Sequence, residues 1–147
     1  MPYYGTKSKA KLATCHLDIV EVCVRAIASG PDHTIIWGGR SATVQADLVA
    51  DGFSQRLDSL HVIGEGRELS DAIDLAPWPV VWPNRENQTQ AECEDAIKRF
   101  HVLAGYILGI AEVLGIALLW GGDWNRNWVY TDQRFDDLGH FERVLQV

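Results

Sequence analysis

Residues 102–120 read VLAGYILGIAEVLGIALLW, an almost unbroken apolar run that the folded chain must remove from water. The run is nearly long enough to cross a bilayer, but Glu112 lies inside it, and a charged side chain is costly in hydrocarbon. Gly115 is typical of a position where a helix ends. We therefore expect no stable membrane insertion, but a buried helix that ends near Gly115 and a buried strand over Ile116–Trp120.

Two long helices are predicted from signals near their ends. Thr89 and Glu92 form a capping box, in which the hydroxyl and the carboxylate bond otherwise unpaired backbone N–H groups. The second helix is expected to start there and to run to about Leu114. The first helix is expected over Ser8–Ser29, because this segment has a broad apolar face and a Gly-Pro pair follows it.

Short strands are expected between and after these helices. The three segments are His33–Gly38, Asp71–Leu75 and Gly139–Leu145. A short helix or turn is expected over Arg40–Asp51, and the polar segment Ser54–Leu69 is expected to be an exposed loop. Because the elements do not alternate as βαβ units, we expect an α+β fold: a small, largely antiparallel sheet packed with two long helices, in a single domain over residues 1–147.

Composition excludes several function classes. The formal net charge is −7, which argues against nucleic acid as the main partner and against a polybasic membrane-surface protein. The three cysteines, Cys15, Cys23 and Cys93, are odd in number and form no CxxC motif, so we expect buried free thiols rather than a disulfide framework. The N-terminal segment has no apolar run typical of a secretory signal, so synthesis in the cytoplasm is expected.

Three side chains are candidate metal ligands. His61 and His140 lie in loop or strand-end contexts rich in glycine and aspartate, and Asp74 is a carboxylate inside an apolar strand. A carboxylate in that position must be paired or bound to a cation. Two histidines and one aspartate would leave one tetrahedral position open, which is typical of a catalytic zinc. Residue types alone leave open whether three such distant residues converge.

Four short motifs in this order resemble a known family. They are Ser59-Leu60-His61, Asp71-Ala72-Ile73-Asp74-Leu75-Ala76-Pro77, Trp120-Gly121-Gly122-Asp123-Trp124-Asn125 and Asp137-Leu138-Gly139-His140-Phe141-Glu142. Upstream, Gly38-Gly39-Arg40-Ser41 is followed by Gln45. Together they resemble the D-Ala-D-Ala carboxypeptidase/L-alanyl-D-glutamate peptidase family of zinc enzymes, and above all its small phage endolysins. The resemblance covers nearly the whole chain.

The resemblance implies roles for individual residues. One Zn²⁺ ion would be bound by His61, Asp74 and His140. Asp137 would be the general base, although Asp136 adjoins it and is an alternative. These roles are carried over from the family and do not follow from spacing.

Two more residues are implied on the substrate side. Arg40 would anchor an acidic group of a peptide, because its planar guanidinium suits carboxylates, and Ser59 would shape the site or touch substrate. The chain separates His61 from Asp74 by more residues than the family usually does. The extra residues fall in Val62–Leu69, whose glycines allow an outward bulge.

The expected function is that of a zinc-dependent peptidoglycan peptidase, an endolysin that cuts the peptide stem, with the L-alanyl–D-glutamate bond favoured. A D-Ala-D-Ala carboxypeptidase or dipeptidase and a non-catalytic wall-binding relative are the alternatives. The resemblance implies a monomer made in the host cytoplasm that reaches the wall after the membrane is permeabilised.

Three further residues have possible roles near the site. Trp124 and Trp128 are candidates for the wall of a substrate groove. Glu142 is either a partner for a ligand histidine or a solvated edge charge.

Overall fold

The computed structural model describes residues 1–64 and 66–145. In chain order the elements are α1 (Thr6–Leu12), α2 (Leu17–Ser29), β1 (His33–Trp37), α3 (Ala42–Ala50), β2 (Ala72–Pro77), α4 (Gln90–Leu114), β3 (Leu118–Trp120) and β4 (His140–Arg143). The strands form one sheet in the order β1-β2-β4-β3, and every neighbouring pair is antiparallel. The expected α+β class with a small antiparallel sheet is confirmed.

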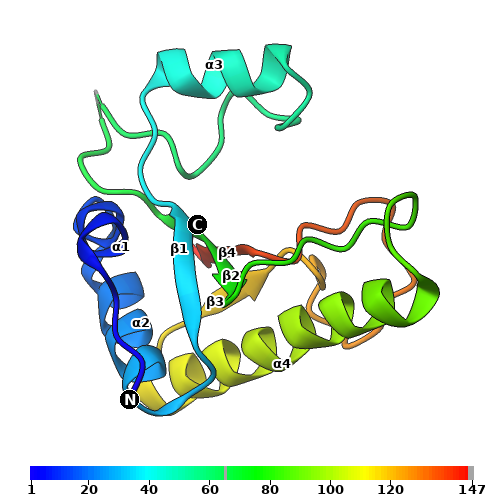
Figure 1. Cartoon of the computed structure of the whole chain (residues 1–147). Coiled ribbons are helices and arrows are strands. Elements are labelled where there is room, and N and C mark those ends of the chain that lie inside the picture. Colours follow the sequence, from blue (N-terminus) through cyan, green and yellow to red (C-terminus); the bar gives the residue numbers. More distant parts are fainter. Residues whose placement is uncertain (65, 146–147) are drawn as a thin grey trace.

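The core lies between the sheet and the two longer helices. Figure 1 shows α4 running along the sheet and α2 beside it, whereas α3 lies apart, beyond the carboxyl end of β1. Large side chains from both helices and three strands are almost fully buried there: Ile19, Phe100, Leu103 and Ile107 from the helices, and Ile35, Ile73, Leu75 and Phe141 from the strands. Since side chains alternate along a strand, burial of Ile73 and Leu75 turns Asp74 to the opposite face.

The second long helix follows its local signals. Thr89 caps α4 by accepting from the N–H of Glu92, whose carboxylate bonds the Thr89 N–H in return. The helix ends at Gly115, which adopts the left-handed conformation with φ 71°. The chain then enters β3, whose Leu118 and Trp120 are buried. Among the described residues, no helix is long and apolar enough to cross a membrane.

The first helix is not continuous, so the expectation of one helix over Ser8–Ser29 was wrong. The segment between α1 and α2 leaves the helix to pair with Ser70: the His16 N–H donates to Ser70 O, and the Ser70 N–H donates to Thr14 O, at 2.9 and 2.8 Å. The ring of His16 then caps α2 by accepting from the N–H of Asp18. These bonds join residues far apart in the chain, so the local apolar pattern could not predict the break.

The segment over Ser54–Leu69 is only partly the exposed loop that was expected. His61 is buried, with 2% of its surface exposed, because its backbone runs beside the end of β1. The Arg40 N–H donates to His61 O at 2.7 Å, and the Ile63 N–H donates to Arg40 O at 2.8 Å. Gly64, Gly66, Glu68 and Leu69 are exposed, and Gly64 pairs with Arg67.

Smaller differences concern strand ends. β2 extends through Pro77, which pairs with His33 of β1, whereas the predicted strand ended at Leu75. The last strand covers only residues 140–143 of the predicted segment. All three cysteines are buried free thiols, as expected.

Candidate metal centre

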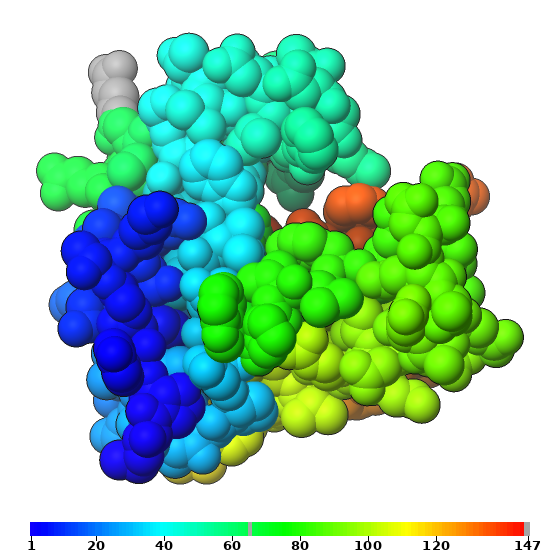
Figure 2. Space-filling model, viewed as in Figure 1, coloured from blue at the N-terminus to red at the C-terminus, as the bar shows by residue number. Residues whose placement is uncertain are grey.

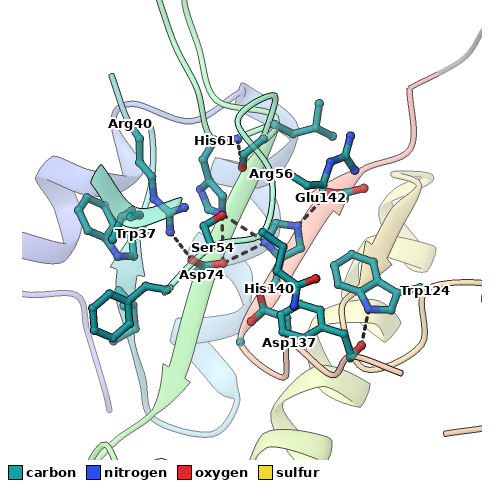
Figure 3. A pocket seen from close by; sticks show the side chains of 18 of the residues that line it. Trp37, Arg40, Ser54, Arg56, His61, Asp74, Trp124, Asp137, His140 and Glu142 are labelled. Carbon is teal, nitrogen blue, oxygen red and sulfur yellow. Dashed lines mark hydrogen bonds and ion pairs between the residues drawn. The ribbon is translucent and has the colours of Figure 1, made fainter. Parts of the chain in front are cut away.

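Three segments bring the candidate ligands together. Asp74 lies in the middle of β2 and His140 begins β4, and the register of the two strands pairs these residues directly. His61 comes from the segment that runs beside residues 38–40. Figure 3 shows the three side chains pointing toward one another in a pocket.

The distances between the three candidate ligand atoms suit a metal ion with tetrahedral coordination. His61 Nε2 lies 3.1 Å from Asp74 Oδ1 and 3.2 Å from His140 Nδ1, and His140 Nδ1 lies 3.1 Å from Asp74 Oδ1. Zinc bonds of about 2.0–2.1 Å in tetrahedral geometry would separate the ligand atoms by about 3.3 Å. The three atoms therefore form one face of a tetrahedron of the right size for such an ion.

The outer ring nitrogens fix which atoms face the centre. His61 Nδ1 lies 2.8 Å from the carbonyl oxygen of Gly38, which can only accept, so Nδ1 carries a proton and a neutral ring leaves a lone pair on Nε2. His140 Nε2 lies 2.9 Å from Glu142 Oε2, which turns His140 Nδ1 to the centre. Such outer partners are typical of metal-binding histidines. Glu142 thus hydrogen-bonds His140, a candidate ligand, and is not merely a solvated edge charge.

The charges of the cluster also favour a cation. Burial raises the pKa of Asp74, but the adjacent imidazoles of His61 and His140 outweigh burial and hold that pKa well below its usual range. Burial lowers the pKa of His140, but its hydrogen bonds to Asp74 and Glu142 raise the pKa to about 9. A proton on His140 therefore compensates the carboxylate, and a divalent cation would displace that proton.

Arg40 holds the aspartate from behind. Its NH2 group lies 2.8 Å from Asp74 Oδ2, and its NH1 group donates to Gln45 Oε1 at 3.1 Å. The guanidinium lies 4.7 Å from the ring centre of Trp37, and its buried Nε has no partner among the described residues. Asp74 thus turns Oδ1 toward the centre, while Arg40 holds Oδ2. The role of Arg40 as a substrate anchor stays a prediction.

Gln45 completes this support. It is fully buried on α3, and its Nε2 group donates to Ser54 Oγ at 2.8 Å and to Arg56 O at 2.6 Å. In the sequence, Gln45 stands out only as part of the motif that follows Arg40. Nothing marks Arg56 as a pocket residue, because a polar loop carries no local signal for the direction of its side chains.

A pocket of about 660 Å³ opens over the three ligands. It is lined by aromatic side chains from several segments: Trp37, Phe53, Trp82, Trp124 and Phe135. Figure 2 shows the hollow between the cyan surface of α3 and the green and orange surfaces of the segments that follow β2 and precede β4. The ring of Trp124 lies 5.5 Å from that of His140, whereas Trp128 is not part of the lining.

Asp137 lines this pocket and Asp136 does not. Asp136 is exposed and accepts from Gln133 Nε2 at 2.6 Å, outside the pocket. Burial and the charge of Asp74 raise the pKa of Asp137, against the lowering effect of the neighbouring cationic groups. Ser59 also lines the pocket, and its hydroxyl accepts from the His61 N–H at 3.3 Å.

Glycine is required next to the last ligand. A side chain at position 139 would approach the carbonyl oxygen of Leu75 to 2.5 Å, and the Leu75 N–H donates to Gly139 O at 2.8 Å. This close approach of backbones lets the chain pass from Asp137 into β4, so that Asp137 and His140 line one pocket.

Comparisons with known proteins identify the family of the chain. The family model described as phage L-alanyl-D-glutamate peptidase matches residues 2–144. The L-alanyl-D-glutamate peptidase of Escherichia phage T5 is 32% identical over 151 residues, which cover 96% of this chain and 97% of the relative. The crystal structure of the L-Ala D-Glu endopeptidase ChiX of Serratia marcescens has the same fold, with a TM-score of 0.68, 23% identity and coverage of 97% of this chain and 91% of that one. The chain belongs to the phage L-alanyl-D-glutamate peptidase family.

Proposed function

We propose that this chain is a zinc-dependent endopeptidase that hydrolyses the L-alanyl–D-glutamate bond of peptidoglycan stems. The observation that carries the proposal is the triangle of His61 Nε2, Asp74 Oδ1 and His140 Nδ1, whose sides measure 3.1–3.2 Å. Family membership supports the bond, and the donor set of two imidazoles and one carboxylate supports zinc. We further propose that residues 1–147 act as one catalytic domain and as a monomer.

The metal and the chain would divide the work. A zinc ion held by His61, Asp74 and His140 would supply a Lewis acid that polarises the scissile carbonyl and lowers the pKa of a bound water. Gly38 and Glu142 keep the ligand rings oriented, and Arg40 keeps Asp74 turned toward the centre. These contacts fix the site before substrate arrives.

We assign proton transfer to Asp137. Its carboxylate lines the pocket over the ligands and would accept the proton of the attacking water and pass it to the leaving amine. The raised pKa of Asp137 suits a group that must both take and return a proton. Ser59 would form part of the wall of the substrate pocket. Arg40, which lies behind Asp74, would attract an acidic substrate through its charge.

The site of action follows from the substrate. Peptidoglycan lies outside the cytoplasmic membrane, so an endolysin made in the host cytoplasm would act on the wall once the membrane has been permeabilised. The net charge of −7 gives the chain no general attraction to anionic lipid, so a separate protein would have to open that route.

The test combines a metal assay with a digest of purified sacculi. We expect about one zinc per chain and peptides that begin with glutamate, as read by mass spectrometry, with both lost in Asp74→Asn. Release of free D-alanine with the L-alanyl–D-glutamate bond intact would instead identify a D-Ala-D-Ala carboxypeptidase. Binding to sacculi without any product would identify a wall-binding relative. Turnover by a zinc-free preparation would refute the proposed requirement for zinc.

A further inference from the structure

The pocket must accommodate a negative charge if the proposed function holds. Whichever carboxyl of a glutamate continues the peptide, the other remains as a free carboxylate close to the scissile bond. The pocket already contains the carboxylates of Asp74, Asp137 and Glu142, which repel such a group. The proposed metal would be occupied with the scissile carbonyl and the attacking water, so another cation is needed to meet this carboxylate. The lining contains two arginines, Arg40 and Arg56.

Arg40 is already committed to protein partners. Only 8% of its surface is exposed, its NH2 group is bonded to Asp74 and its NH1 group to Gln45. A substrate carboxylate could take these hydrogen bonds only by releasing a proposed metal ligand. Arg40 therefore contributes charge at a distance, without a free pair of donors for a bidentate contact.

Arg56 has the opposite properties. Its side chain is 68% exposed, and its guanidinium bonds Asp58 through Nε and NH2, both at 3.1 Å. An exposed ion pair of this kind contributes little to stability, so a substrate carboxylate can share or replace Asp58 at low cost. Figure 3 shows Arg56 near Glu142 at the edge of the pocket that holds the ligands.

The main chain of Arg56 is held in place, although its side chain is exposed. Gln45 Nε2 donates to the Arg56 carbonyl oxygen at 2.6 Å, and the same side chain accepts from Arg40 NH1. The buried amide thus sets the position of the exposed arginine relative to the arginine that holds Asp74. Because the backbone of Arg56 is held, its guanidinium can bind a carboxylate in the pocket with little further ordering of the loop.

We propose that Arg56 is the specificity-determining residue that binds the free carboxylate of the substrate's glutamate. The inference rests on the proposed function. It predicts a preference for stems whose glutamate carries a free carboxylate over stems in which that group is a carboxamide.

The test uses two synthetic substrates, N-acetyl-L-alanyl-γ-D-glutamyl-L-lysine and its counterpart with the free glutamate carboxylate converted to a carboxamide. For Arg56→Gln we expect kcat/KM to fall roughly 10- to 100-fold on the first peptide and less than about 2-fold on the second, because only the first loses a charge-assisted bond. Arg56→Lys should retain part of the preference, since it keeps a point charge without the planar fork.

Arg25→Gln is the matched control. Arg25 is 62% exposed and pairs with Glu21 at the surface of α2, outside the pocket, so kcat/KM on both peptides should stay unchanged. An equal loss on both peptides in Arg56→Gln, or an undiminished preference for the carboxylate, would overturn the assignment while leaving the proposed function intact. Failure of the wild-type chain to cleave either peptide would overturn the proposed function and this inference together.

Discussion

At the level of single residues, hydrogen bonds to the outer atoms of the three candidate ligands orient their inner atoms. The carbonyl oxygen of Gly38 and the carboxylate of Glu142 take one ring nitrogen of each histidine, and Arg40 takes one oxygen of Asp74. Each ligand is left with one electron-pair donor that faces the other two. The same logic separates Asp137, which faces the pocket, from Asp136, which is bonded outside it.

The assignment of the base predicts a split between metal binding and catalysis. Asp137→Asn should retain about one zinc per chain, because Asp137 is not one of the three clustered side chains, while kcat falls roughly 10²- to 10⁴-fold with the loss of a general base. Metal content and peptide hydrolysis measured on the same preparation check both parts. Asp136→Asn should behave like the wild-type chain, and the reverse pattern would transfer the role to Asp136.

A buried histidine far from the centre predicts a pH effect on stability. His33 is buried, with its Nδ1 2.7 Å from Pro31 O and its Nε2 2.6 Å from the Tyr4 hydroxyl. Burial lowers the pKa of His33 from 6.5, against smaller effects of Pro31 and Asp32. The unfolded chain therefore binds a proton more readily, and the stabilising contribution present above pH 6.5 is lost as the pH falls below it.

Urea unfolding on both sides of pH 6.5 measures that contribution. The free energy of unfolding of the wild-type chain should fall more between the two conditions than that of His33→Gln, which has no ring to protonate. Identical losses in the two proteins would show that His33 does not supply the effect.

At the scale of elements, α4 carries the most local information. Its start depends on the reciprocal bonds between Thr89 and Glu92, and its end on the left-handed conformation of Gly115. The helix then supplies a large share of the core through Phe100, Leu103 and Ile107. Local capping is thus connected to the packing that supports β2 and β4.

Removal of the cap predicts a measurable loss of stability. Thr89→Ala leaves the Glu92 N–H without its side-chain acceptor and should lower the free energy of unfolding by about 0.5–2 kcal/mol, measured by urea denaturation. Thr89→Ser keeps the hydroxyl and should lose much less. Equal losses in the two variants would mean that the methyl group, rather than the cap, is responsible.

At the scale of the whole molecule, the centre connects three segments that are distant in the chain. His61, Asp74 and His140 belong to the segment beside β1, to β2 and to β4. A bound ion would therefore cross-link the sheet to the segment beneath α3. Such an ion binds the folded chain far better than the unfolded one, in which the ligands are dispersed.

Metal loading should accordingly raise the melting temperature. With free zinc at 100 times its Kd, the folded state gains about 2.7 kcal/mol relative to the metal-free chain, which scanning calorimetry detects as a higher Tm. His61→Ala should lose this gain, whereas His101→Ala, whose ring packs on Trp120 away from the cluster, should keep it. A gain that persists in His61→Ala would place the stabilising ion elsewhere.

Features that depend on neighbours in the chain were predictable from the amino-acid residues alone. The capping box at Thr89, the end of α4 at Gly115 and the burial of β3 follow from residues within a few positions of one another. The ligand set was implied by the order of motifs in a family resemblance, while residue types alone left its convergence open. Asp74 in an apolar strand still indicated that a cation or an ion pair was needed.

The remaining features depend on contacts between segments that are distant in the chain. The bonds between Ser70 and the segment before α2 interrupt the first helix. The backbone bonds of Arg40 with the segment around His61 hold that histidine buried inside a loop that is otherwise largely exposed. The register of β2 and β4 places Asp74 beside His140, and Gln45 connects Arg40 to Arg56. The periodicity of hydrophobic residues and the capping motifs cannot predict these contacts, because such signals act over one or two helical turns. The pairing of distant backbone segments depends instead on the whole fold.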